Sequence, residues 1–345
     1  WGGDLMQAKG ATLVRHYKEL AFMGFFEVLL NLITILRNIK FCKNDILAFK
    51  PDAIILVDYP GFNMRIAKFA KSHQIPVYYY ISPQVWAWKK NRVYEIKKYV
   101  TKLFTILPFE KDFYAKYDCE VEYLGHPILD AVSNFKEERK MFKSQWKNNS
   151  KRLVALLPGS RIQELNKMLP KMLVLKKQFP QCDFVIAGVS SLGLDFYQSH
   201  IKDSNIKVVF GQTYALLDEA DAALVSSGTA TLETALFNVP QVVCYQTSWL
   251  SYKIAKLLVK VKYISLVNLI ADKEIVKELI QKNLTELNMV SELNFILSEA
   301  GSDAIINKYQ DLKDVLGDVG ASERVANALV NDLKNHKTRA QDRTS

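Results

Sequence analysis

The chain has 345 residues, which is enough for two domains of ordinary size. Apolar residues make up 49% of it and charged residues 24%, which excludes a disordered or fibrous protein. Lys and Arg outnumber Asp and Glu by 46 to 36, and the net charge of +10 suits an anionic membrane surface, a phosphorylated substrate or nucleic acid. Because the basic residues are dispersed and no nucleic-acid-binding motif occurs, we expect no nucleic acid partner.

The chain opens with Trp1-Gly2-Gly3-Asp4, a pattern typical of a strand that ends in a turn. We therefore expect a strand and a helix upstream of it. The four cysteines form no C-x-x-C pair, which indicates reduced thiols in a cytoplasmic protein rather than disulfides or a zinc site.

The segment Leu20–Ile39 predicts a helix with an unusually wide apolar face. It is too short and too polar to span a bilayer, so it is either buried in the fold or lies in a membrane interface and contacts acyl chains. The apolar pattern alone slightly favours burial, whereas the nearby bases Arg37, Lys40 and Lys43 favour the interface. The apolar residues concerned are Phe22, Phe25, Phe26, Leu29, Leu32, Ile33 and Leu36.

Short apolar runs then alternate with helical stretches of about 15–25 residues, a pattern typical of parallel sheets covered by crossover helices. Most of these runs are continuous rather than alternating, which indicates strands buried on both faces. We expect strands at Ala53–Val57, Val77–Ile81, Leu103–Leu107, Val121–Leu124, Leu153–Leu157, Phe184–Ala187, Lys207–Phe210, Ala222–Val225 and Val242–Tyr245. The predicted fold class is α/β, with two doubly wound domains.

The segment Asn134–Arg152 is rich in Lys, Glu and Asn and is either the domain junction or a solvated surface helix. We assign residues 1–145 to an N-terminal domain that receives the acceptor and contacts the membrane. Residues 151–310 then form a C-terminal nucleotide-sugar domain, and residues 311–345 a last helix with a polar tail.

Two loops of the second half follow a predicted strand and precede a predicted helix. In the first, Gly159 permits a tight turn, and Ser160 and Arg161 stand at the helix start, where free N–H groups and a guanidinium suit a pyrophosphate. In the second, Ser227, Gly228 and Thr229 offer hydroxyl and N–H groups. Each loop alone also fits an ordinary strand-to-helix turn with a capping residue. Two such loops in one domain favour a nucleotide.

Glu233 stands about one turn into the helix after the second loop, where a carboxylate can accept hydrogen bonds from a ribose diol. The chain contains no dinucleotide fingerprint, no P-loop and no D-x-D pair of metal-binding acids. We therefore expect no cofactor and no metal, and expect the positive groups of the protein to stabilise a departing diphosphate.

In the first half, Asp58 ends a strand, and a partly desolvated carboxylate there is a candidate general base. Spacing alone favours the simpler role of an Asx-turn or helix cap. Other polar or aromatic residues follow the strands of this half and are candidates for lining a cleft, although a single one is more often structural. They are Asn63, Trp86, Trp88, Lys89 and His126.

Nine stretches, taken together and in order, resemble the lipid-A-disaccharide synthases, which are inverting glycosyltransferases of the GT-B architecture. Each stretch alone is weak evidence, but nine in the order of the family are highly specific. They are Gly3–Ala8, Leu20–Gly24, Val57–Asn63 with the preceding Pro51-Asp52, Ser82–Trp88, Leu107–Glu110, Gly125–Pro127, Leu156–Arg161, Ser227–Glu233 and Tyr263–Ile270.

The resemblance implies that UDP-2,3-diacylglucosamine and 2,3-diacylglucosamine 1-phosphate are joined to a β-1′,6-linked disaccharide phosphate with release of UDP. By this resemblance, Asp58 is the general base, and Asn268 is one of the UDP-binding residues of the second half. It also implies two Rossmann-like domains about a cleft, a peripheral place on the cytoplasmic face of the inner membrane, and homodimers with exchanged C-terminal segments. The family begins with a strand and a G-E-x-S-G-D loop, and neither occurs before Trp1.

Three other functions remain open from the sequence. Two are GT-B enzymes on UDP-sugars, namely a transferase acting on a lipid-linked peptidoglycan intermediate and a UDP-N-acetylglucosamine 2-epimerase. The epimerase is disfavoured because its substrate is soluble and gives no reason for an acyl-sized apolar helix. The third is a non-catalytic, membrane-peripheral protein that binds a nucleotide sugar.

Overall fold

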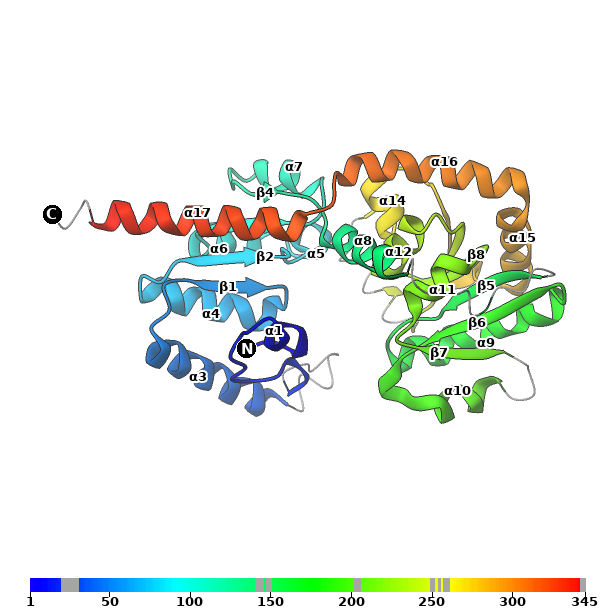
Figure 1. Cartoon of the computed structure of the whole chain (residues 1–345), viewed down its shortest axis with the longest axis horizontal. Helices are drawn as coiled ribbons and strands as arrows, with labels where there is room; N and C mark the ends of the chain where they lie inside the picture. The colour runs from blue at the N-terminus through cyan, green and yellow to red at the C-terminus, as the bar shows by residue number, and fades with distance from the viewer. Residues whose placement is uncertain are drawn as a thin grey trace.

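Parallel strands form two separate sheets in the computed structural model, which describes residues 1–19, 31–139, 146, 151–201, 206–248, 252–253, 256 and 261–341. The first sheet has the order β1-β2-β3-β4, and the second has the order β10-β9-β8-β5-β6-β7. Each sheet belongs to one half of the chain, and the two halves lie side by side (Figure 1). The predicted fold class is confirmed.

The first sheet consists of β1 (Ile54–Val57), β2 (Val77–Tyr80), β3 (Lys102–Thr105) and β4 (Glu122–Tyr123). Its helices are α1 (Asp4–Ala8), α3 (Leu32–Phe49), α4 (Pro60–Ser72), α5 (Val85–Trp88), α6 (Arg92–Tyr99), α7 (Glu110–Ala115) and α8 (Pro127–Arg139). Strand β1 is an edge strand, and Ile55 and Val57 are about half exposed. The sequence analysis expected burial on both faces for most of the strands, and β1 does not have it.

The second sheet consists of β5 (Arg152–Leu157), β6 (Cys182–Gly188), β7 (Lys207–Phe210), β8 (Ala222–Ser226), β9 (Gln241–Tyr245) and β10 (Lys277–Ile280). Its helices are α9 (Ile162–Gln178), α10 (Gly193–Ile201), α11 (Thr213–Glu219), α12 (Thr229–Leu236), α14 (Leu266–Ala271), α15 (Glu286–Leu297) and α16 (Glu299–Leu316). Strands β5 and β8 are buried along nearly their whole length, as their continuous apolar runs predict.

Strand β10 is absent from the sequence-based prediction. It begins with Lys277 and Glu278, so it lacks the apolar run that reveals the other strands, and only its pairing with β9 makes it a strand. It lies at the edge of the sheet, where charged residues are common.

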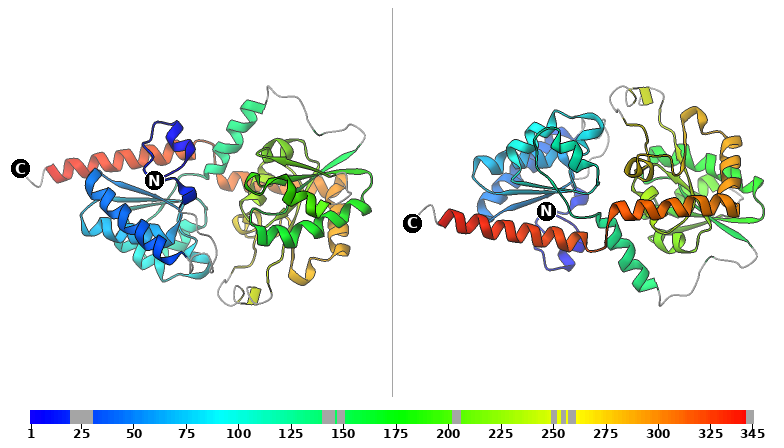
Figure 2. Two further views of the ribbon diagram at one scale, coloured as in Figure 1. Left: turned by 90° about the horizontal axis from the view of Figure 1, so that it is seen from below. Right: turned by 90° about the horizontal axis from the view of Figure 1, so that it is seen from above.

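The last helix, α17 (Ala321–Gln341), leaves the second half and packs on the first sheet (Figures 1 and 2). Its residues Val325 and Leu329 are buried against Tyr78 of β2 and Phe104 of β3. The hydroxyl of Tyr78 also donates a hydrogen bond of 2.8 Å to Asp332. The residues assigned to a separate C-terminal segment thus divide between the two halves, since α16 ends at Leu316 on the second one.

Helix α8 provides a second connection. Its Asp130 carboxylate accepts the backbone N–H groups of Gly320, Ala321 and Ser322 at the start of α17, at 2.6–3.2 Å. Helix α8 is about three turns long and reaches the second half. There its Phe135 packs edge-on against the ring of Tyr214. One helix thus anchors α17 and contacts both halves of the molecule.

Candidate functional site

The order of the second sheet brings its two candidate loops together. The chain runs from β5 outward to β7 on one side, and then returns to β8 beside β5 and runs outward to β10 on the other. The boundary between β5 and β8 is therefore the topological switch point, where open α/β sheets bind ligands beyond the carboxyl ends of their strands. The loops after β5 and β8 both lie at this boundary.

The loop after β5 turns at Gly159, which has a φ of +113°. A Cβ atom at this position would lie 2.7 Å from Oε2 of Glu164, the end of a flexible side chain, and 3.4 Å from Oγ of Ser226, so it is the backbone conformation that requires glycine. Helix α9 begins at Ile162, directly after Ser160 and Arg161. The Arg161 side chain is 65% exposed and forms an ion pair of 3.0 Å with Glu164.

The loop after β8 turns at Gly228, whose φ of +151° and ψ of −162° lie in a region that only glycine adopts readily. Helix α12 begins at Thr229. The hydroxyl of Ser227 donates a hydrogen bond of 2.9 Å to the carbonyl of Ile264 and so ties this loop to the segment before α14. The neighbouring Ser226 Oγ is buried and has no hydrogen-bond partner within the described part of the chain.

Glu233 of α12 accepts a hydrogen bond of 2.8 Å from the hydroxyl of Tyr214. Burial raises the pKa of Glu233, and the hydrogen bond from Tyr214 opposes that shift only in part. Tyr214, on α11, is a contact that the sequence did not predict.

Asn268 is fully buried, and its amide contacts only protein groups. Its Nδ2 donates to the carbonyl of Val276 and to Glu278, while its Oδ1 accepts the N–H groups of Ile275 and Val276. In this structure Asn268 therefore holds the loop that precedes β10.

Glu278 of β10 is the centre of the same cluster. It accepts hydrogen bonds from the Ser265 hydroxyl at 2.7 Å and from the backbone N–H groups of Ile264 and Ser265. Because Ile264 in turn accepts the hydroxyl of Ser227, the cluster extends to the loop after β8. The charged start of β10 offers no sequence signal for this role.

In the first half, the turn at Asp58 has an unusual backbone. Asp58 and Tyr59 both have a φ of +45°, in the left-handed region that costs a non-glycine residue about 1–3 kcal/mol. The carbonyl of Asp58 accepts the Tyr79 hydroxyl at 2.6 Å and Nδ2 of Asn63 at 2.7 Å. These two bonds hold the turn, so Asn63 acts on Asp58 through the backbone, and the Asp58 side chain remains exposed at the end of β1.

Glu110 organises the loop after β2. The sequence analysis named this residue only as part of Leu107–Glu110, one of the stretches that resemble the family. This residue is 1% exposed. It accepts Nε1 of Trp86 at 3.2 Å and the backbone N–H groups of Ile106 and Leu107. Burial raises the pKa of Glu110 to about 7, although these hydrogen bonds act to lower it.

The other predicted residues of this loop are less informative. Lys89 is exposed at the end of α5. The side chain of Trp88 lies outside what the structure describes. Trp86 also packs edge-on against Phe109, with ring centroids 5.0 Å apart, so its indole is fixed by two contacts.

His126 is 3% exposed at the end of β4. Its Nδ1 accepts the N–H of Ile128 at 3.1 Å, which places the proton of the neutral ring on Nε2. Burial lowers the pKa of His126 to about 4, so the ring is neutral at physiological pH. The Nε2 atom is buried and has no partner within the described part of the chain.

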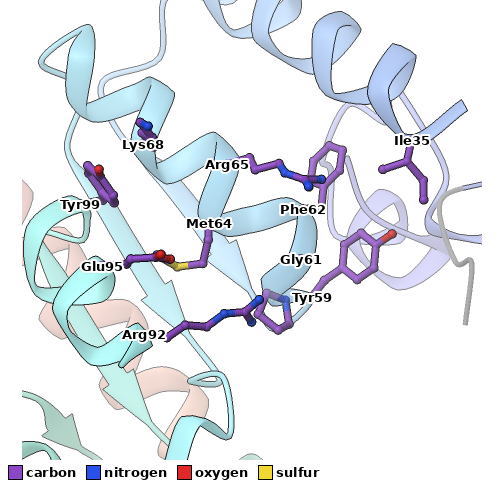
Figure 3. Close-up of a pocket in the computed structure, with 11 residues that line it drawn as sticks. Ile35, Tyr59, Gly61, Phe62, Met64, Arg65, Lys68, Arg92, Glu95 and Tyr99 are labelled. Atoms are coloured by element: carbon purple, nitrogen blue, oxygen red, sulfur yellow. The ribbon is translucent and has the colours of Figure 1, made fainter. Parts of the chain in front are cut away.

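A cavity of about 480 Å³ opens beside the Asp58 turn, between α3, α4 and α6 (Figure 3). The basic residues Arg65, Lys68 and Arg92 line it. The sequence analysis did not predict this cavity, because it depends on how α4 and α6 pack. The available signal was the spacing of Arg65 and Lys68, which places both on one face of the helix that follows Asp58.

Of the apolar residues predicted for membrane contact, Phe22, Phe25, Phe26 and Leu29 lie outside the described residues. Leu32, Ile33 and Leu36 are in the first turns of α3 and are 44%, 67% and 52% exposed. The opposite face of α3 is buried at Ile35 and Ile39. No helix within the described ranges is long and apolar enough to cross a membrane.

The buried carboxyl group of Glu110 generates a prediction about stability. A pKa raised from 4.5 to about 7 in the folded state favours folding below pH 4.5, and this contribution is lost as the pH rises through 7. We measure the free energy of unfolding with urea at pH 4 and at pH 8. Between these two values it should decrease by about 3 kcal/mol more for the wild-type protein than for the Glu110→Gln variant.

The exposed Glu120 provides the control, since Glu120→Gln should follow the wild-type protein at every pH. A parallel pH dependence of wild type and Glu110→Gln would contradict the prediction.

Comparison with known proteins agrees with this arrangement. A family model described as lipid-A-disaccharide synthetase matches residues 1–329. The lipid-A-disaccharide synthase of Psychromonas ingrahamii is 38% identical over 343 residues, which cover 97% of this chain and 90% of the relative. That of Syntrophus aciditrophicus is 37% identical over 333 residues, which cover 94% and 87%.

Solved structures with lower identity show the fold. The UDP-GlcNAc 2-epimerase from Neisseria meningitidis bound to UDP-GlcNAc has a TM-score of 0.67 at 15% identity, covering 95% of this chain and 88% of its own. The glycotransferase of kitacinnamycin has a TM-score of 0.61 at 12% identity, covering 93% and 88%. With two Rossmann-like domains of the GT-B architecture and a family match over nearly its whole length, the chain belongs to the lipid-A-disaccharide synthase family.

Proposed function

We propose that the protein is an inverting, metal-independent glycosyltransferase that joins UDP-2,3-diacylglucosamine to 2,3-diacylglucosamine 1-phosphate. The products are UDP and the β-1′,6-linked disaccharide 1-phosphate. Beyond the family membership, the observation that supports this proposal most is the sheet order, which brings the loops after β5 and β8 side by side at the switch point.

The second half binds the donor in this proposal. The N–H groups at Gly159 and Ser160 and the exposed guanidinium of Arg161 stabilise the diphosphate as negative charge develops on it. The loop of Ser227, Gly228 and Thr229 contributes from the neighbouring strand. Glu233 accepts hydrogen bonds from the ribose diol, and the Tyr214 hydroxyl orients its carboxylate. Asn268 acts indirectly, by holding the segment to which Ser227 is bonded.

The first half binds the acceptor. The Asp58 carboxylate takes the proton of the acceptor 6-hydroxyl as its oxygen attacks the anomeric carbon of the donor. The new C–O bond forms while the bond from that carbon to UDP breaks, and UDP leaves with the bonding electron pair. General-base catalysis of this kind contributes about 10²–10⁴-fold to the rate.

The remaining residues of the first half shape the acceptor site. Trp86, fixed by Glu110, gives the loop after β2 an aromatic wall, and Lys89 is exposed at the end of α5. The Nε2–H group of His126 is a buried donor available to a substrate oxygen. Asn63 keeps the Asp58 carboxylate in place through the backbone.

The start of α3 brings the protein to its lipid substrates. Ile33 and Leu36 stand on the same exposed face as Arg37 and Lys40, which combines apolar contact with attraction to anionic headgroups. We place the protein on the cytoplasmic face of the inner membrane, as a peripheral protein that forms homodimers.

Replacing Asp58 tests the general-base role. Asp58→Asn should lower kcat for UDP release from the two acylated sugars by about 10²–10⁴-fold, because the carboxamide cannot take up the proton. UDP affinity, measured by calorimetry, should be unchanged in this variant, whereas Arg161→Ala should weaken it about tenfold or more. Near-normal kcat in Asp58→Asn would remove Asp58 from the role.

Asp52 provides the matched control, since it lies just before the opposite end of β1 and is also exposed. Asp52→Asn should retain kcat. An equal loss in both variants would indicate a general effect of charge rather than catalysis by Asp58.

Removing the Tyr79 hydroxyl tests whether the turn positions Asp58. Tyr79→Phe leaves only Asn63 to hold the strained carbonyl, so the carboxylate should lose its alignment and kcat should fall about tenfold or more with little change in the KM for the donor. Tyr309→Phe is the control, because its hydroxyl is also buried and donates to a carbonyl, that of Val239, in the second half. Unchanged kcat in Tyr79→Phe would contradict the positioning role.

Replacing the exposed apolar residues of α3 tests membrane contact. The double variant Ile33→Ser/Leu36→Ser should bind anionic vesicles at least about tenfold more weakly in sedimentation, because each side chain loses apolar burial worth about 1–3 kcal/mol. Leu287→Ser removes an even more exposed apolar side chain, on α15, and should bind vesicles normally. Normal vesicle binding by the double variant would exclude this face of α3.

A further inference from the structure

The cavity lies beside the turn that follows Asp58 at the end of β1. Tyr59 and Gly61, which follow Asp58 directly, line one part of it, and Ile35, Phe62 and Met64 provide apolar walls. Its volume of about 480 Å³ lies within the range of sites that hold small ligands. A molecule with one group at the Asp58 carboxylate can therefore extend into the cavity without leaving the protein surface.

The charge in this cavity is positive. Arg65, Lys68 and Arg92 line it together with a single acid, Glu95, so the lining carries two more positive than negative charges. No described carboxylate lies within ion-pair distance of Arg65 or Lys68. The start of α4, a helix of 13 residues, adds a partial positive charge at Pro60. These features favour an anionic ligand.

Arg92 lines the cavity from α6. Figure 3 shows its guanidinium directed from α6 toward the start of α4. Burial raises the pKa of Tyr79, the Asp58 carboxylate raises it further, and Arg92 acts in the opposite direction. Arg92 and Asp58 are thus electrostatic neighbours of the same hydroxyl, the one that holds the turn.

The ligands of the proposed reaction carry two kinds of phosphate. The diphosphate of the donor belongs with the loops of the second sheet. The acceptor carries a phosphomonoester on C1, which is separated by the ring oxygen from the carbon that bears the 6-hydroxymethyl group. When the 6-hydroxyl is at Asp58, the phosphate therefore needs a separate cationic site about one sugar ring away. Planar guanidinium groups suit phosphate oxygens because they donate two parallel hydrogen bonds.

We propose that the cavity between α3, α4 and α6 binds the phosphomonoester of the acylated acceptor sugar, with Arg65 and Arg92 as its principal contacts and Lys68 as a supporting charge. This inference rests on the proposed function and assigns one part of its acceptor. The apolar walls of Ile35 and Phe62 then receive the first part of the acyl chains. The same helix that supplies Ile35 presents Ile33 and Leu36 outward, so the chains can continue over α3 toward a bilayer.

Kinetics with two acceptors test this site. UDP release is measured with 2,3-diacylglucosamine 1-phosphate and with the same lipid lacking the phosphate, for wild type and for the single variants Arg65→Gln and Arg92→Gln. With the phosphorylated acceptor, kcat/KM of each variant should be about tenfold to a hundredfold lower than that of the wild-type protein. With the dephosphorylated acceptor, kcat/KM of each variant should equal that of the wild-type protein. The KM for the donor should not change. Arg65 is exposed, so its replacement leaves the fold intact.

Lys71→Gln is the matched control, because Lys71 is exposed on the same helix outside the cavity and its replacement removes the same charge. It should behave as the wild-type protein. Sedimentation with anionic vesicles separates the acceptor from membrane headgroups as the source of the phosphate: Arg65→Gln and Lys71→Gln should bind vesicles equally. Inorganic phosphate should compete with the phosphorylated acceptor in the wild-type protein and not in Arg65→Gln.

Equal losses with both acceptors would overturn the phosphate assignment while leaving the proposed function intact. A loss of vesicle binding specific to Arg65→Gln would also overturn it and would assign the cavity to lipid headgroups. Absence of UDP release from the wild-type protein with either acceptor would overturn the proposed function itself, and this inference with it.

Discussion

Three backbone N–H groups at the start of α17 donate to one carboxylate, Asp130 of α8, and this contact joins the two halves of the molecule. In the proposed function, the loops that bind the donor lie on the second sheet and Asp58 lies on the first, so the reaction needs both halves. Helix α8 packs on the second half through Phe135 and anchors α17, which returns to the first sheet. These two helices and the charged cap therefore help to fix the relation between the two sheets, together with contacts such as the hydrogen bond from the Tyr123 hydroxyl of β4 to the carbonyl of Leu316.

Within each half, buried polar groups hold the functional turns. The strained backbone at Asp58 persists because Tyr79 and Asn63 both donate to its carbonyl. Glu278 performs a comparable role for the segment that contacts Ser227, and Glu110 for the loop of Trp86. In all three places an inward-facing side chain forms hydrogen bonds with the backbone or with a neighbouring side chain, and a different side chain faces outward. Rigid support of this kind is what positions reacting groups accurately.

The first half combines features suited to an amphiphilic substrate. The exposed face of α3 carries apolar and basic residues, and the cavity beside α4 joins apolar walls to a surplus of positive charge. The turn that follows Asp58 contributes Tyr59, Pro60 and Gly61 to the lining of this cavity. A phosphorylated, acylated sugar has its hydroxyl, phosphate and chains in a matching order, which is the physical basis for assigning the acceptor to this half.

Sequence patterns predicted the α/β class, nine of the ten strands found in the described part of the chain, and the loops at Gly159 and Ser227, because continuous apolar runs and glycines after strands are local signals. Motifs in a fixed order indicated the family. Tertiary structure alone decided that β10 is a strand, that α17 packs on the first sheet, that Asn268 is buried, and that Arg65 and Arg92 line one cavity. Each of these depends on how elements pack against one another in three dimensions, which the local pattern of apolar residues and glycines does not specify.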